Sequence, residues 1–207
     1  MKDKVIVFWF RRDLRLDDNV GLYQALQNDV PVLPIFIFDT EILENLPKND
    51  ARVTFIHKQL QKISNQLRTN HGSSIAQFHD TPKKVFKQLL DDFDIEAVYT
   101  NHDYEPYAKK RDEEIKSLLE ENDVQFNTFK DQVIFEKDEV VKDDGDPYVV
   151  YTPFMRKWKE NFNPSTHLVE YDTLSDLGKN LYESKKLPRL SLEDMGFEES
   201  SIEVPDY

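Results

Sequence analysis

The sequence predicts an α/β domain built on an open, doubly wound parallel sheet of five strands with helices on both faces. Two observations carry this prediction. Short runs of almost continuous apolar residues suit strands that are buried on both faces. The stretches between them repeat apolar residues at spacings of three and four, which is typical of helices that pack by one face. The expected strands are residues 5–10, 32–38, 74–78, 97–100 and 124–128.

Four helices are predicted between these strands. The first, at about residues 19–26, has the weakest signal because Gly21 lies inside it. The second follows Asp50, whose side chain can cap its first turn. Thr81-Pro82 marks the start of the third helix, and Pro106 marks the start of the fourth.

This alternation of strand and helix is that of a Rossmann-like domain, and it predicts a domain over residues 1–130. Ligands of such sheets bind beyond the carboxyl ends of the strands. Three turns are therefore candidate parts of a site, at residues 11–18, 39–50 and 101–107.

Residues 131–207 lack a sustained period and are expected to form an extended interdomain linker. From residue 187 onward there is one cation, Arg189, against six anions, and a segment this acidic rarely packs a core alone. We expect this part to be open, so that protease cuts the chain after about residue 160 while residues 1–130 resist. A second domain is expected after residue 207.

Composition excludes several classes of function. The 27 Lys and Arg residues against 40 Asp and Glu residues give a formal charge of −13, which argues against a nucleic-acid grip. The chain has no cysteine, which excludes disulfides and thiolate chemistry and fits a reducing cytoplasm. The longest apolar run, residues 5–10, is too short to span a membrane. Five scattered glycines cannot build a glycine-rich phosphate loop, so classical dinucleotide and P-loop sites are excluded.

The densest charge pattern is the turn after the first strand, where Arg11, Arg12 and Arg15 alternate with three aspartates up to Asp18. Such a turn can be purely structural, with the guanidinium groups clamping neighbouring carboxylates and backbone. Alternatively, one arginine faces a bound anion or a heteroaromatic ring. Spacing alone favours the structural interpretation.

Four blocks of sequence resemble the DNA photolyase and cryptochrome family, in the family's order and over about 160 residues. The first is the amino-terminal signature VFWFRRDLRLDDN at residues 7–19, and the second is LPIFIFD at residues 33–39. The third is AVYTNHDYEPY at residues 97–107 with KRD at residues 110–112, and the fourth is GDPYVVYTPF at residues 145–154.

The resemblance implies one half of a two-domain, light-driven flavoprotein. In the family, a helical second domain binds FAD and damaged DNA, and the excited reduced flavin splits cyclobutane pyrimidine dimers by electron transfer. The α/β domain carries an auxiliary antenna pigment in many members. We therefore expect this chain to be the antenna domain of a deoxyribodipyrimidine photolyase. It would be monomeric, without membrane contact and without catalytic residues of its own, and it would depend on the missing helical domain for FAD and DNA.

The resemblance also implies where a pigment would lie. Phe36 and Phe38 at the end of the second strand are candidate apolar walls, which could equally be plain core. The candidate polar partners are Arg11, Asp39, Arg52, Asp103 and Glu105. A deazaflavin or flavin fits the pattern better than a folate, because the places of an Asn-Glu pair in folate-binding members hold Tyr107 and Ala108.

Three other interpretations stay open. A cryptochrome, a blue-light receptor, shares the same blocks. A stand-alone nucleotide-binding α/β domain would hold an adenylate at residues 11–18, and a regulatory fragment would have no enzymatic role.

The aromatic and basic stretch at residues 152–159 could bind nucleic acid, although packing on a neighbouring domain is the favoured interpretation.

Overall fold

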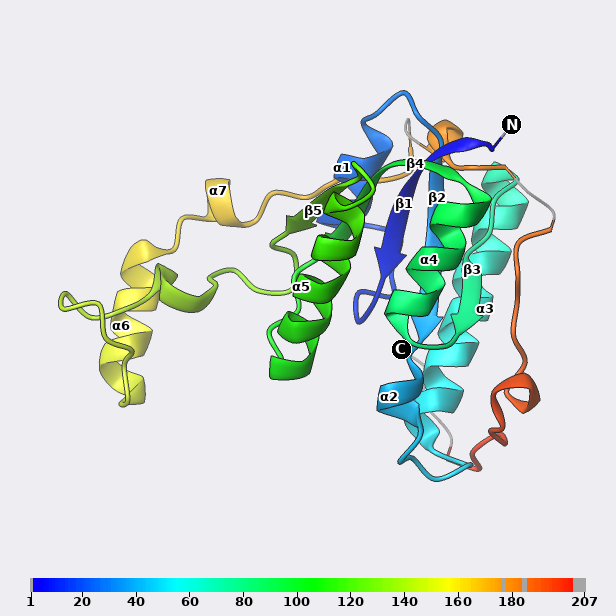
Figure 1. Cartoon of the computed structure of the whole chain (residues 1–207). Coiled ribbons are helices and arrows are strands. Elements are labelled where there is room, and N and C mark those ends of the chain that lie inside the picture. The colour runs from blue at the N-terminus through cyan, green and yellow to red at the C-terminus, as the bar shows by residue number, and fades with distance from the viewer. Residues whose placement is uncertain (1, 176–177, 184–185, 203–207) are drawn as a thin grey trace.

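The computed structural model describes residues 2–175, 178–183 and 186–202. Its centre is a sheet of five parallel strands in the order β3-β2-β1-β4-β5 (Figure 1). This confirms the predicted doubly wound α/β fold. The strands are β1 at Lys4–Phe10, β2 at Val32–Phe38, β3 at Ala76–His79, β4 at Asp94–Asn101 and β5 at Gln125–Phe129.

Helices cover both faces of the sheet. One face packs against α1 (Val20–Leu26) and α3 (Ala51–His71), and the other against α4 (Pro82–Asp92) and α5 (Pro106–Glu120). Asp50 caps α3 as predicted, by accepting a hydrogen bond from the Arg52 backbone. A further helix of four residues, α2 (Thr40–Leu43), follows β2 and was not predicted.

Because both faces of the sheet are covered, every residue in the middle of β1 is buried, which explains its continuous apolar sequence. Consecutive β1 residues, such as Phe8 and Trp9, belong to separate hydrophobic clusters on opposite sides of the sheet. Both side chains are buried. Fully burying a large apolar side chain contributes about 1.5–3 kcal/mol, so this double-sided burial is the main source of stability for the fold.

Gly21, the weak point of the first predicted helix, is explained by a close approach of α1 to β4. The Gly21 N–H donates to Asn101 Oδ1 over 2.8 Å. Asn101 is buried, and its Nδ2 donates to Asn19 Oδ1 over 2.9 Å and also to Asp13. A Cβ atom at position 21 would lie 2.6 Å from Asn101 Oδ1 and 3.0 Å from the Phe8 ring. The position therefore needs a residue without a side chain.

We expect Gly21→Ala to destabilise the protein although alanine is the better helix former. Overpacking costs about 1–3 kcal/mol, which exceeds the roughly 1 kcal/mol that alanine gains over glycine inside a helix. Urea unfolding measures the difference. Gln24→Ala, one turn later on α1, is the matched control and should change stability by no more than about 0.5 kcal/mol. A Gly21→Ala protein as stable as the wild type would contradict the close approach.

The expected openness of the acidic tail is wrong for the residues that the structure describes after residue 170. Leu181, Leu192, Met195 and Phe197 are buried in the cluster on the α1 and α3 face. The Tyr182 N–H donates to the Val32 carbonyl over 2.7 Å, and the Gln77 N–H donates to Pro188 over 2.9 Å. Because these apolar residues lie in irregular chain or in a single 3₁₀ turn, and not in an α-helix or a strand, they follow no period that a pattern search could detect. Residues 203–207, the end of the predicted linker, lie outside the described residues.

We call the described residues 171–175, 178–183 and 186–199 the strap. In Figure 1 it runs from beside α1, past the amino ends of the strands and down along α3. Its two short 3₁₀ helices are Gly178–Asn180 and Glu193–Met195. Near its end, the Glu198 N–H donates to the Lys48 carbonyl over 2.8 Å. The strap thus covers the β3 side of the sheet.

Residues 131–170 form an arm that projects from the β5 side of the sheet (Figure 1). It contains a 3₁₀ helix at Lys137–Glu139, α6 at Tyr151–Asn161 and α7 at Pro164–His167. The Phe135 ring packs edge-on against Trp158, at 5.4 Å between ring centroids. Whether the domain boundary lies near residue 130 stays a prediction.

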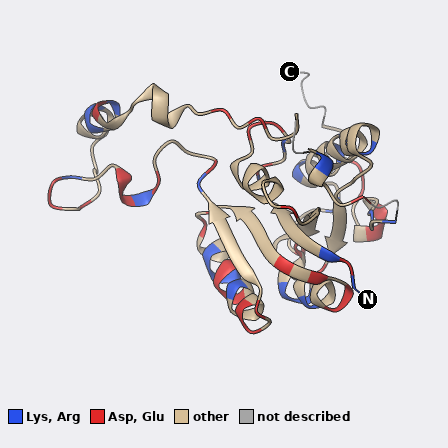
Figure 2. Cartoon of the chain, turned by 90° about the horizontal axis from the view of Figure 1, so that it is seen from above, with Lys and Arg blue, Asp and Glu red and all other residues tan. Residues whose placement is uncertain are grey.

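Charges of both signs are interspersed along α5 and the arm (Figure 2). This mixture is in keeping with the 27 Lys and Arg residues against 40 Asp and Glu residues in the sequence. Among the described helices, none is long and apolar enough to cross a membrane.

Candidate functional site

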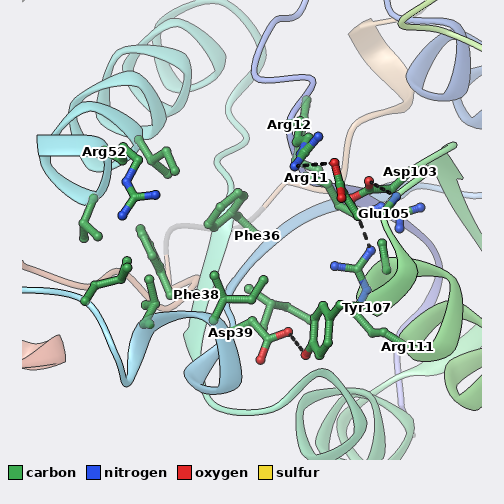
Figure 3. Close-up of a pocket in the computed structure, with 18 of the residues that line it drawn as sticks. Arg11, Arg12, Phe36, Phe38, Asp39, Arg52, Asp103, Glu105, Tyr107 and Arg111 are labelled. Atoms are coloured by element: carbon green, nitrogen blue, oxygen red, sulfur yellow. Dashed lines mark hydrogen bonds and ion pairs between the residues drawn. The ribbon is translucent and has the colours of Figure 1, made fainter. Parts of the chain in front are cut away.

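A cavity of about 1030 Å³ opens at the carboxyl ends of β1, β2 and β4 (Figure 3). This is the edge of the sheet at which doubly wound domains hold their ligands. All seven residues predicted for a pigment site line it, namely Arg11, Phe36, Phe38, Asp39, Arg52, Asp103 and Glu105. The fold therefore brings together side chains that are up to 94 positions apart in the sequence, from Arg11 to Glu105.

Phe36 and Phe38 form an aromatic wall of the cavity. Their ring centroids are 4.9 Å apart and the rings meet edge to face. Their exposed fractions are only 7% and 3%, and both rings belong to the core cluster that α3 covers. Both residues thus belong to the core and also line the cavity, while their contact with a pigment stays a prediction.

A second apolar wall was missed by sequence reasoning. It comes from α2, the loop after it and the first turns of α3, and its lining residues are Ile42, Leu43, Leu46, Phe55 and Ile56. Ile42 and Phe55 stay 49% and 43% exposed. A helix of four residues shows no period, so only the buried Asp39 that caps it could have signalled α2.

Arg11 has a structural role, in line with the ion-paired interpretation of the turn. Its guanidinium group donates to both Asp112 oxygens over 2.7 Å, to Thr100 Oγ1 over 2.9 Å and to the Asn101 carbonyl over 2.6 Å. Its side chain is 6% exposed. Burial lowers the pKa of Arg11 while the neighbouring Asp112 carboxylate opposes that shift. A substitution here removes support for the cavity wall, so Arg11 variants are a poor test of ligand contact.

The other two arginines of the turn point to different neighbours. Arg12 is exposed and lies 3.9 Å from Glu105 at the cavity rim. Arg15 pairs with the buried Asp131 carboxylate over 2.7 Å, which fixes the turn to the segment after β5. Of the three, Arg12 keeps the most accessible charge beside the cavity.

Asp103 lies close to Arg111, a residue not predicted for the site. The Arg111 guanidinium carbon lies 4.8 Å above the centre of the Trp9 ring, and its Nη2 is 3.8 Å from Asp103. Arg11 stacks on the same indole at 4.9 Å. Each cation–π contact of this kind is worth about 0.5–2 kcal/mol, depending on how far the cation is desolvated. Trp9 is therefore a core residue, as expected, that also supports one wall.

Asp39 and Tyr107 join two walls of the cavity. Asp39 caps α2 by accepting from the Glu41 N–H over 3.1 Å, and its other oxygen accepts from the Tyr107 hydroxyl over 2.5 Å (Figure 3). Burial and the Asp39 carboxylate raise the pKa of Tyr107, so the phenol stays protonated at neutral pH. The Tyr107 hydroxyl donates its hydrogen bond to Asp39, and its oxygen can still accept a hydrogen bond from a ligand.

Arg52 lies across the cavity from Asp103 and Glu105 (Figure 3). Its side chain is 72% exposed and pairs with Asp50 over 2.7 Å. The Arg52 hydrogen bond lowers the pKa of Asp50 to about 2. An exposed pair of this kind contributes little to stability, which leaves Arg52 available to a ligand at small cost.

A cavity with aromatic and aliphatic walls and a few fixed polar groups at its rim suits a planar heteroaromatic molecule.

A family model described as DNA photolyase matches residues 6–172, which is most of the chain. The chain belongs to the DNA photolyase family. It corresponds to the amino-terminal α/β domain of these proteins, as the four sequence blocks predict.

Similar proteins support this membership. The deoxyribodipyrimidine photo-lyase of a Synechococcus strain is 32% identical over 160 residues, which are 77% of this chain and 33% of that protein. The crystal structure of a class III photolyase from Agrobacterium tumefaciens has a TM-score of 0.76 and 26% identity, and the match covers 94% of this chain and 38% of that one.

An archaeal photolyase from Sulfolobus tokodaii has a TM-score of 0.61 and 34% identity over 67% of this chain and 32% of that one. Its structure is described as containing two FAD molecules and as implying a novel light-harvesting cofactor. Cryptochrome-1 of Aedes aegypti is also similar, at 27% identity over 204 residues. This photolyase-family chain spans about a third to a half of the length of curated relatives that it matches.

Proposed function

We propose that this chain is the light-harvesting domain of a deoxyribodipyrimidine photolyase and that the cavity beyond β1, β2 and β4 binds the antenna pigment. The observation that carries this proposal is the cavity itself, whose volume of about 1030 Å³ is large enough for a tricyclic ring system with a side chain. Membership of the photolyase family makes absorption of light the natural use for such a ligand.

The chemistry of the lining favours a flavin or a deazaflavin. Phe36 and Phe38 offer an aromatic surface, while the Tyr107 oxygen and the exposed Arg52 can meet the polar edge or side chain of the pigment. A folate is less well served, because Tyr107 and Ala108 supply no carboxylate for a pterin. The second FAD reported for the Sulfolobus tokodaii photolyase supports a flavin in this role.

The remaining steps belong to the complete protein. We propose that a helical domain binds FAD and damaged DNA and receives excitation energy from the antenna, and that the complete protein is a cytoplasmic monomer. The arm supports contact with such a domain. Val149, Val150 and Tyr151 are 94%, 58% and 75% exposed at the start of α6, and apolar side chains of this size gain stability when another surface covers them.

A binding titration tests the proposal. Purified chain is mixed with riboflavin, 8-hydroxy-5-deazariboflavin, methenyltetrahydrofolate or ATP, and binding is followed by ligand fluorescence or, for ATP, by calorimetry. We expect riboflavin or the deazaflavin to bind at least tenfold more tightly than the folate. Binding of ATP without any pigment would favour the stand-alone nucleotide-binding domain, and no binding of any pigment would refute the antenna function.

Cryptochrome is the second candidate, supported by the similarity to the Aedes aegypti protein. It predicts the same cavity, so the titration does not separate the two. Repair of cyclobutane dimers under blue light by the complete protein would favour the photolyase, and photoreduction of its FAD without repair would favour the cryptochrome.

A further inference from the structure

The segment after β4 faces two ways. Asp103 and Glu105 line the cavity, whereas the residues between and before them, Tyr104 and His102, contact the arm. Successive side chains of an extended segment point to opposite sides, so one short stretch of chain can serve both surfaces. Any shift of this segment must therefore move the cavity wall and the arm contact together.

Glu136 of the arm is where His102 and Tyr104 converge. The Tyr104 hydroxyl donates to Glu136 Oε1 over 2.5 Å, and His102 Nδ1 lies 2.5 Å from the same oxygen. Since a carboxylate can only accept, Nδ1 of the histidine is the protonated nitrogen, and Nε2 can accept from Thr128 Oγ1 at 3.1 Å. Burial disfavours ionisation of Glu136, but the hydrogen bonds from Tyr104 and His102 outweigh it and lower the pKa of this carboxyl.

Further contacts lead from Glu136 along the arm to α6. Its neighbour Phe135 lies against Trp158 of α6 at 5.4 Å and against His167 at 4.8 Å, measured between ring centroids. Glu136 also caps the 3₁₀ helix at Lys137–Glu139, and the Glu139 carboxylate accepts from the Glu136 N–H. A continuous series of contacts thus leads from the rim of the cavity to α6, which lies far from the sheet (Figure 1).

We propose that His102, Tyr104 and Glu136 are positioning residues of the cavity and that they couple its occupancy to the position of the arm. This rests on the proposed function, since it concerns the same cavity. A ligand that orders the 101–105 segment also orders the contact with Glu136, and the coupling must be reciprocal: an arm held in place favours the bound form of the cavity by the same factor.

A purely local brace is the competing interpretation. In that case His102 and Tyr104 would fix only the start of the arm, and Asp103 and Glu105 would keep their places without them. The interpretations differ in one respect. Only coupling makes pigment affinity depend on Glu136, which does not line the cavity.

The test combines hydrogen exchange with pigment binding. Glu136→Ala removes the acceptor for both partners, and Glu136→Gln restores one acceptor oxygen of similar shape. Glu114→Ala is the matched control, since Glu114 of α5 forms an exposed pair with Lys83 of α4. We expect Glu136→Ala to speed amide exchange in residues 101–107 of the ligand-free chain, and Glu136→Gln to recover most of the protection.

With 8-hydroxy-5-deazariboflavin as the probe, Glu136→Ala should weaken binding about five- to tenfold, at the low end of measured couplings between sites. In the wild-type chain the pigment should slow exchange at residues 135–139. Unchanged affinity in Glu136→Ala, or an arm that ignores the pigment, would overturn the coupling. If the wild-type chain binds no pigment, the antenna function fails, and exchange at residues 101–107 alone decides whether Glu136 positions the cavity wall.

Discussion

Arg11→Ala is expected to destabilise the protein by about 3–5 kcal/mol, the cost of removing one member of a buried ion pair. The substitution leaves the Asp112 carboxylate without its main partner and strips hydrogen bonds from Thr100 and the Asn101 carbonyl. These groups join β4 to α5 and to the turn after β1. The effect should therefore appear as a loss of global stability in urea unfolding.

Arg12→Ala is the control for this measurement. Arg12 is the next residue in the turn and also lines the cavity, but its pair with Glu105 is 3.9 Å long and exposed. Exposed pairs contribute about 0–1 kcal/mol. A similar loss from both substitutions would mean that the buried network around Arg11 is not the source of the effect.

Ala51→Trp is expected to abolish pigment binding while leaving the fold intact. Ala51 is the first residue of α3 and lines the cavity, so an indole at this position occupies the space meant for the ligand. Loss of most of the contact with Phe36 and Phe38 should weaken binding by far more than tenfold, or more than about 1.4 kcal/mol. Fluorescence titration with the deazaflavin measures the change.

The matched substitution is Gln66→Trp, on an exposed position of the same helix. It adds the same side chain outside the cavity and should bind pigment like the wild type. Thermal unfolding of both variants checks that the proteins are folded. Normal binding by a folded Ala51→Trp protein would place the pigment elsewhere and refute the cavity as its site.

The sequence predicts the fold well because its main elements carry strong local signals. A strand buried on both faces must be apolar throughout, and β2 (Val32–Phe38) is found at the predicted bounds. The signal fails where structure depends on distant partners. Leu181 and Phe197 of the strap pack against the core as single residues spaced far apart in the sequence. Neither periodicity nor composition predicts such contacts.

The candidate site is predicted mainly by the resemblance to the photolyase family and only partly by the chemistry of the residues. The positions after β1, β2 and β4 follow from the fold, and all seven predicted residues line one cavity. The direction in which each side chain points could not be predicted, however. Arg11 and Arg12 are neighbours of the same type, yet Arg11 is buried in an ion pair with Asp112 and Arg12 is exposed. In the sequence, Tyr107 differs from the folate pattern and carries no other signal, because its hydrogen bond to Asp39 depends on how α2 follows β2.

The strap has a consequence for how the molecule is made. Met195 and Phe197 complete a cluster whose other members include Phe8 and Leu22, so the α1 and α3 face stays incomplete until residues 195–197 have left the ribosome. Pairings between residues so far apart slow folding, because the long loop must close before the contacts can form. During synthesis this apolar face is therefore exposed to other nascent chains and to chaperones, and folding is completed only when the strap arrives.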